Sequence, residues 1–145
     1  MPERFTAPVA VHLFLTRRNQ ILLLRRYNTG FEDGNYSVIA GHLDGNEEVK
    51  TAMIREAREE AGIEIQSEDL KIVGVMHRMV DEERIDFFLT TLTWSGEIVN
   101  KEPDKCDELA WFDFDNLPPN MIPYVRQAFS NFRDEKWFDS FGWSK

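Results

Sequence analysis

Short apolar runs and two stretches of helical periodicity alternate along the chain. Residues 7–15 and 21–26 are apolar and β-branched on either side of a polar turn, which predicts a pair of β-strands. Because both runs are almost continuously apolar, we expect the two faces of these strands to be covered. Further strand-like stretches occupy residues 36–40, 70–80, 84–93 and 109–112.

The segment from Glu47 to Gly62 has the period of an amphipathic helix. Two acidic residues stand where it should begin and a glycine where it should end, as helix termini favour. One side of the helical wheel is apolar, and Glu56 and Glu60 fall in line with it, with Glu59 at its flank. We therefore expect these three carboxylates to point inward and not toward solvent.

Three inward glutamates repel one another, so a cation is needed to offset their charge. Arg55 lies four residues before Glu59 and can hold one carboxylate, but one guanidinium does not neutralise three. Mg²⁺ prefers a few carboxylates together with water and substrate phosphates. The pattern thus favours a Mg²⁺ (or Mn²⁺) site over a solvated acidic helix face, because charge runs on a solvated face do not share the apolar side.

The stretch from Gly41 to Ile63 resembles the Nudix box of the Nudix hydrolase superfamily. Gly41 and Glu47 are followed by Arg55-Glu56-Ala57-Arg58-Glu59-Glu60-Ala61-Gly62-Ile63, which fills each charged and glycine position of that signature. Ala57 is a departure, because the family more often has a larger aliphatic residue there, and it affects packing and not chemistry. The resemblance implies an α/β (α+β) fold, an α/β/α sandwich with a mixed β-sheet between helices. We expect one domain over residues 1–145, with its core at about 7–133.

The resemblance also implies a reaction, the hydrolysis of a phosphoanhydride bond in a nucleoside diphosphate linked to another moiety. Similarity to MutT-like enzymes favours conversion of a (d)NTP to a (d)NMP and pyrophosphate. Two alternatives stay open. The substrate could instead be a nucleotide sugar, a dinucleoside polyphosphate, a capped RNA or a prenyl diphosphate. The chain could also be a noncatalytic module that senses a nucleotide.

Residue roles follow from the same resemblance. The residues expected to act in catalysis are Glu56, Glu59 and Arg55, with Arg55 holding Glu59 or Glu47, and which carboxylate takes the proton is left open. A Gly-Glu pair followed by a later glutamate resembles a metal-binding loop of mutator-type enzymes, and the matching residue is Glu102, with Asp104 and Glu108 as competitors. The expected metal ligands are Glu56, Glu59, Glu60, Glu102 and the backbone carbonyl of Ala40.

Substrate contacts are expected outside the box, from residues that could stack on a base or contact a phosphate. Each could equally be a core or surface residue. Asn120 could read a base edge, although capping a helix over about residues 121–132 is the favoured role. The candidates are Arg25, Phe31, Tyr36, Arg84, Phe88 and Asn120.

Charge and composition narrow the partners. A formal net charge of -9 disfavours nonspecific binding to nucleic acid or an anionic membrane, but it permits a small phosphorylated ligand held through metal. The single cysteine, Cys106, excludes an internal disulfide framework and fits a reducing compartment. The N-terminus has no pattern typical of a signal peptide, so the cytoplasm is the expected location. His77 is interpreted as an ordinary strand residue, and a zinc site is not expected.

The last residues, 134–145, are unusually aromatic for a terminus. This tail could cover the core, complete a pocket or pack on a second subunit, so a homodimer is a further possibility.

Overall fold

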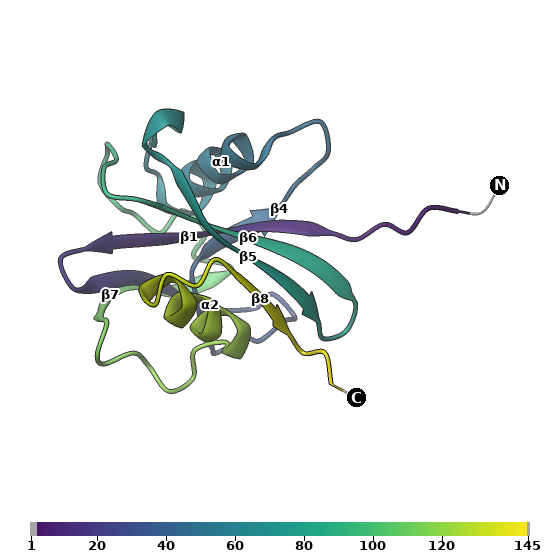
Figure 1. The fold of residues 1–145 in the computed structure, drawn as a ribbon. Coiled ribbons are helices and arrows are strands. Elements are labelled where there is room, and N and C mark those ends of the chain that lie inside the picture. The colour runs from purple at the N-terminus through teal and green to yellow at the C-terminus, as the bar shows by residue number, and fades with distance from the viewer. Residues whose placement is uncertain (1–2, 145) are drawn as a thin grey trace.

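The computed structural model describes residues 3–144, which form one mixed β-sheet with helices on both of its faces (Figure 1). The strand order is β3-β2-β1-β6-β5-β8, with β4 paired to β1 and β7 paired to β2. The pairs β1–β6 and β5–β8 are parallel, and the other pairs are antiparallel. The strands are β1 (Val9–Arg17), β2 (Gln20–Arg26), β3 (Tyr36–Ser37), β4 (Ile39–His42), β5 (Lys71–Met79), β6 (Glu83–Thr91), β7 (Cys106–Asp113) and β8 (Phe138–Phe141).

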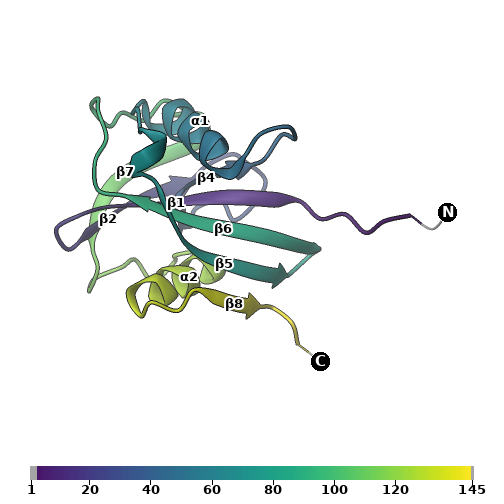
Figure 2. The same ribbon diagram turned by 45° about the horizontal axis from the view of Figure 1, so that its top comes forward.

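The two α-helices, α1 (Val49–Ala61) and α2 (Pro123–Arg133), cover opposite faces of the sheet, as Figures 1 and 2 show. Side chains of β1 alternate between them. Leu13 packs in the core beneath α1, and its neighbour Phe14 packs in the core beneath α2. The expected α/β/α sandwich is therefore confirmed, and the continuous apolar runs are explained by burial on both faces. A short 3-10 helix, η1 (Ser67–Asp69), follows α1.

The helix α1 ends where the sequence predicts, and it begins at Val49, two residues after the predicted start, with Glu48 as its capping residue. The Glu48 side chain accepts a hydrogen bond of 2.6 Å from the Lys50 backbone N–H and caps the N-terminus. Gly62 ends the helix in the left-handed conformation, with φ of 70°, and its N–H donates to the Arg58 carbonyl at 3.1 Å. Glycine suits this position because it adopts positive φ without strain.

Three segments differ from the prediction. Residues 36–40 form parts of two short strands, β3 and β4, and not one strand. The aromatic tail contains β8, which pairs with β5. Asn120 does not cap α2, because Ile122 holds the capping position and Pro123 begins the helix. The Asn120 side chain instead donates a 2.8 Å hydrogen bond to the Gly34 carbonyl.

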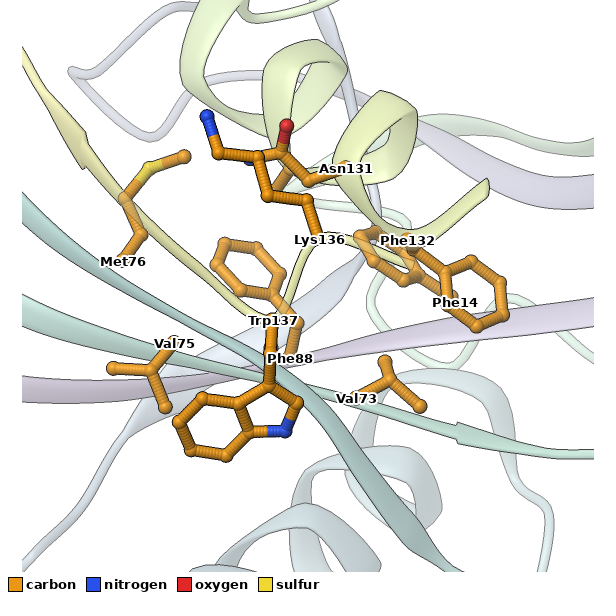
Figure 3. A pocket seen from close by; sticks show the side chains of 11 residues that line it. Phe14, Val73, Val75, Met76, Phe88, Asn131, Phe132, Lys136 and Trp137 are labelled. Atoms are coloured by element: carbon orange, nitrogen blue, oxygen red, sulfur yellow. The ribbon is translucent and has the colours of Figure 1, made fainter. Parts of the chain in front are cut away.

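Aromatic side chains fill the space between α2 and β5. Figure 3 shows Phe14, Phe88, Phe132 and Trp137 around a small crevice of about 10 Å³. That volume accommodates about one water molecule, so this region is a packed core and not a ligand pocket. Phe88 is 2% exposed and belongs to this core, which assigns it a packing role. Within residues 3–144, we find no helix with the length and apolar character needed to cross a membrane.

Candidate active site

The Gly41 backbone lies directly against the Glu56 carboxylate, where β4 passes under α1. A Cβ atom built on Gly41 would stand 2.1 Å from the Glu56 carboxylate carbon, well inside any real contact. Glu56 is 9% exposed, so this carboxylate is held in the interior of the protein. A glycine is therefore required at position 41 because the glutamate side chain occupies the space of a Cβ.

Arg55 connects the glycine-rich loop before α1 to the carboxylates on the helix. Its Nε donates to Glu47 at 2.7 Å and its Nη1 to Glu56 at 2.9 Å, while Glu59 is farther away at 3.6 Å. The Arg55 guanidinium lowers the pKa of Glu47 below its usual value. Of the two partners expected for Arg55, Glu47 is thus the one that it binds closely. Charge-assisted hydrogen bonds of this kind fix the position of Arg55 relative to Glu56.

Glu102 reaches the same region because its loop is pinned to the end of α1. The backbone N–H groups of Val99 and Lys101 donate to the carbonyls of Ala61 and Glu60, at 3.0 and 3.2 Å. These bonds use carbonyls that a helix C-terminus leaves free. Glu108, one of the two competitors, instead accepts a short hydrogen bond from the Tyr36 hydroxyl.

These groups surround one open cavity of about 470 Å³, which we call the acidic cavity. Four carboxylates line it, together with the cationic side chains of Arg26 and Lys105 at its edge. Its other lining residues are Leu24, Asn28, Thr29, Val38, Ala40, Cys106 and Leu109, and the carboxylates belong to Glu56, Glu59, Glu60 and Glu102.

The pKa shifts in the acidic cavity reflect burial first and neighbouring negative charge second. Burial raises the pKa of Glu60 well above its ordinary value, and the nearby Glu56 and Glu102 add to this effect. Burial also raises the pKa of Glu102, with Glu56 and Glu59 contributing, although Lys105 opposes the shift. Both shifts mean that burial and the neighbouring carboxylates disfavour the ionised forms of these two side chains.

The chemistry of this donor set fits a hard divalent cation. Four carboxylates offer oxygen donors, and a cation beside them would favour the ionised form of Glu60, which burial and the nearby Glu56 disfavour. Among the described residues, no three His, Cys, Asp or Glu side chains converge closely enough to enclose an ion by themselves.

One expectation about α1 is wrong. Glu56 is buried and Glu60 partly buried, but the Glu59 side chain is 49% exposed. Glu59 lies at the flank of the apolar side, where the wheel turns toward solvent, so it lines the rim of the acidic cavity and does not point into the core.

A second cavity, of about 440 Å³, adjoins the first, and we call it the arginine cavity. Arg26 and Ala40 line both cavities. Two of the predicted substrate-binding residues, Phe31 and Arg84, line the arginine cavity. Phe31 is 42% exposed, and the Arg26 guanidinium lies 5.3 Å from its ring centre. The remaining lining residues are Ala10, His12, Gly41, His42, Arg78, Val80, Asp81 and Tyr124.

The other substrate-binding candidates lie elsewhere. Arg25 pairs with Asp107 at 2.8 Å, on the side of β2 opposite Leu24 and Arg26. Tyr36 is buried against Phe112, with its hydroxyl on Glu108. Neither arrangement brings these side chains to the two cavities.

Arg25 and Arg26 both end the second predicted strand as donors that could meet a phosphate or pair with surface acids, but only Arg25 is among the predicted substrate-binding residues. Arg26 is the one that lines both cavities. Its Nε donates to the Phe31 carbonyl at 2.6 Å and its Nη2 to Thr29 at 3.0 Å, so it also orders the loop that follows β2. Strand alternation could have found it, because Arg26 shares a face with Leu22 and Leu24, which belong to the core beneath α1.

Comparisons with known proteins give a consistent result. NAD-capped RNA hydrolase NudC from Pseudomonas aeruginosa is 34% identical over 107 residues, which are 74% of this chain and 36% of that relative. The enzyme of the same name from Pseudomonas putida is 30% identical over 112 residues, 74% of this chain and 37% of the relative. This chain therefore spans just over a third of the length of the curated relatives that it matches.

Solved structures agree in fold. A MutT NUDIX hydrolase from Burkholderia pseudomallei superposes with a TM-score of 0.80 at 27% identity, covering 87% of this chain and 98% of that one. A MutT protein from Methanosarcina mazei Go1 has a TM-score of 0.77 at 21% identity, over 89% and 94% of the two chains.

The family comparison covers most of the molecule. A family model described as NUDIX domain matches residues 6–132, which include the whole of α1 and the loop that carries Glu102. Together with the glutamates of the acidic cavity and the α/β/α sandwich, this match establishes that the chain belongs to the Nudix family, whose members hydrolyse acid anhydrides.

Proposed function

We propose that this protein is a Mg²⁺-dependent hydrolase that cleaves a phosphoanhydride bond in a nucleoside diphosphate linked to another group. The preferred reaction converts a (d)NTP to a (d)NMP and pyrophosphate. The observation that carries the proposal is the acidic cavity, which is lined by four glutamates and Ala40, together with Arg26 and Lys105. A polyphosphate cannot approach that many carboxylates unless a divalent cation lies between them.

Bound Mg²⁺ would neutralise phosphate charge and lower the pKa of a water molecule. In the reaction the water oxygen forms a bond to one phosphorus, and the bond from that phosphorus to the bridging oxygen breaks. The leaving phosphate keeps the electron pair, and the water proton passes to a carboxylate. We propose Glu56 for this proton or for a bridging position beside the metal, with Glu59, Glu60, Glu102 and the Ala40 carbonyl as the other ligands.

Other residues of the chain would orient these groups. Arg55 holds Glu56 through its Nη1 and stays charged at all relevant pH, so Glu56 keeps its position while the substrate binds. Arg26 and Lys105 line the same cavity and supply positive charge for the phosphates that the metal does not contact.

A second substrate class is favoured by the relatives. Both curated relatives described above are named NAD-capped RNA hydrolase, and NAD contains a phosphoanhydride bond between two nucleosides. The arginine cavity beside the acidic cavity offers a place for a nucleoside on one side of that bond. A dinucleotide, free or at the end of an RNA, is therefore the second candidate. The single cysteine favours a reducing compartment such as the cytoplasm for either substrate.

The test is a product analysis over a substrate panel. Nucleoside triphosphates, NADH, NAD-capped RNA, nucleotide sugars and dinucleoside polyphosphates are incubated with Mg²⁺ or with chelator, and the products are separated by ion-exchange chromatography. We expect at least one compound to be hydrolysed with Mg²⁺, and we expect chelator to abolish this turnover. Nucleoside monophosphate plus pyrophosphate would establish the first candidate. Two mononucleotides from NADH, or nicotinamide mononucleotide plus an RNA with a 5′-monophosphate from the capped RNA, would establish the second.

A matched pair of variants separates chemistry from folding. Glu60→Gln removes a charge inside the acidic cavity, and Glu68→Gln removes one from η1, where the side chain is exposed. Turnover should be lost in the first variant and kept in the second. Tight nucleotide binding with no Mg²⁺-dependent turnover of any compound would refute the hydrolase proposal and indicate a nucleotide sensor.

A further inference from the structure

A buried chain of hydrogen bonds forms part of the wall of the arginine cavity. His12, on β1, is 1% exposed and uses both ring nitrogens. Its Nδ1 lies 3.2 Å from the Phe87 carbonyl oxygen, and its Nε2 lies 2.9 Å from the Tyr124 hydroxyl of α2. His12 and Tyr124 both line the cavity, and neither belongs to the acidic cavity.

The chemistry of these partners fixes the direction of each bond. A carbonyl oxygen only accepts hydrogen bonds, so the Nδ1 of His12 must carry the proton that it shares with Phe87. In a neutral imidazole the other nitrogen, Nε2, is then an acceptor. The Tyr124 hydroxyl consequently donates its proton to His12, and its oxygen retains only the capacity to accept a hydrogen bond.

The surroundings keep His12 neutral. Burial lowers the pKa of the imidazole, and Arg78 and His42 lower it further. Asp86, whose nearest oxygen is 3.9 Å from Nε2, raises the pKa, but that carboxylate already binds Arg78 through bonds of 2.7 and 3.2 Å. Burial also raises the pKa of Tyr124 to about 12, so the phenol keeps the proton that it donates.

From this geometry we propose that Tyr124, oriented by His12, selects substrates whose base carries an amino group over those with a carbonyl in its place. An exocyclic amino group donates to the free acceptor of Tyr124, whereas a carbonyl would place two acceptors against each other. This inference rests on the proposed function, because it assumes that the substrate is a nucleotide whose base occupies the arginine cavity.

The rest of the arginine cavity suits a planar base. Its volume of about 440 Å³ is within the range of small-molecule sites, and Phe31 offers an exposed aromatic face at its wall. The Arg78 guanidinium stacks 3.6 Å from the centre of the Tyr124 ring and fixes that ring in place. Arg26 and Ala40 line both cavities, so the two cavities adjoin each other. A nucleotide whose base binds in the arginine cavity could therefore place its phosphates beside the glutamates of the acidic cavity.

The first experiment measures binding without metal or turnover. Dissociation constants of AMP, IMP, CMP and UMP are determined by isothermal titration calorimetry. Each of the pairs AMP/IMP and CMP/UMP exchanges an amino group for a carbonyl. We expect the nucleotide with the amino group to bind at least about tenfold more tightly than its partner in the pair. The reason is that leaving a buried acceptor without a donor weakens binding by about that factor. Equal affinities, or tighter binding of IMP and UMP, would overturn the proposal.

Variants test the residue assignment. Tyr124→Phe removes the acceptor, so the ratio within each pair should fall to about twofold or less. Tyr27→Phe removes a hydroxyl from an exposed tyrosine and should leave the ratio at the wild-type value. His12→Gln keeps the tyrosine hydroxyl but lets it turn, because an amide offers both a donor and an acceptor. It should also reduce the ratio, and thermal melts check that each variant is folded.

The tautomer is tested directly, so the proposal does not depend on a folded variant. Nitrogen-15 NMR of the histidine rings should show neutral His12 with its proton on Nδ1 near pH 7. A proton on Nε2, or on both nitrogens, would reverse the direction of the Tyr124 bond and overturn the proposal. A binding preference with no Mg²⁺-dependent turnover would refute the proposed function alone, and turnover without the preference would refute this inference alone.

Discussion

Replacing Gly41 with alanine should remove activity while leaving the protein folded. The new Cβ would lie 2.1 Å from the Glu56 carboxylate, and ordinary van der Waals contact begins at about 3.4 Å, so the carboxylate must retreat by about 1.3 Å. A shift of that size would break the 2.9 Å hydrogen bond between the Glu56 carboxylate and Arg55 unless the Arg55 side chain moves with it. The substitution therefore displaces a proposed catalytic group without altering its chemistry.

The magnitude follows from the displacement. A misplacement of about 1 Å in a catalytic group can reduce the rate by about 100-fold, which corresponds to about 2.7 kcal/mol of activation free energy. The free energy of unfolding should fall by about 1–3 kcal/mol because of overpacking, and the protein should stay folded because the atoms that must move are at the end of a side chain. We expect a lower kcat together with a melting temperature reduced by several degrees.

Gly74 provides the matched control. A Cβ at Gly74 would meet the Trp137 carbonyl oxygen at 3.5 Å and the Phe88 Cβ at 4.0 Å, which are ordinary contacts. Steady-state kinetics with Mg²⁺ and the substrate found in the panel, alongside thermal melts, are measured for Gly41→Ala, Gly74→Ala and wild type. If Gly41→Ala keeps more than a third of the wild-type kcat, the argument that Glu56 must occupy this position is refuted.

Three further predictions concern charged and buried groups. Mg²⁺ at 100 times its dissociation constant should raise the free energy of unfolding by about 2.7 kcal/mol in wild type, and Glu60→Gln should lose most of this gain in urea titrations. Asp86→Ala should reduce that free energy by about 3–5 kcal/mol, because it leaves the Arg78 guanidinium buried without its partner, and a loss below 1 kcal/mol would contradict this. Burial lowers the pKa of His12 in the folded protein, Arg78 and His42 lower it further, and Asp86 opposes the shift. As the pH falls below 6.5, His12 is therefore protonated in the unfolded chain before it is protonated in the folded protein. The free energy of unfolding should therefore fall between pH 7.5 and 5.5 by more in wild type than in His12→Gln, and equal slopes would show that His12 does not titrate in this range.

Local patterns were sufficient to predict most of the secondary structure. The ends of α1 follow from an acidic N-terminus and Gly62, and both are determined by neighbours in the sequence. The two-sided burial of β1 follows from its continuous apolar run. The strand β8 was not predicted, because pairing with β5 depends on where the chain returns after α2 and not on a hydrophobic alternation of its own.

The site was predicted where one element carries it and less completely where several elements meet. Glu56 and Glu60 share a helix face, so their common cavity could be inferred from spacing. Glu102 was one of three acidic candidates, and what distinguishes it is backbone pairing between its loop and the end of α1. Arg25 was preferred over Arg26 although neighbouring strand residues face opposite sides, and the face that borders the cavities depends on where α1 packs.

The arrangement of the two cavities would separate the proposed bond cleavage from the proposed base recognition. The carboxylates come from α1 and the loop before β7, whereas the wall of the arginine cavity is contributed by β1, β5 and α2 through His12, Arg78 and Tyr124. Substitutions in the second group can therefore alter which nucleotide binds without moving a proposed metal ligand. Arg26 and Ala40 line both cavities, so in the proposed binding mode they lie between the base and the glutamates. A box that is filled at every charged position is thus compatible with many substrates, because the residues that would distinguish them lie on other elements.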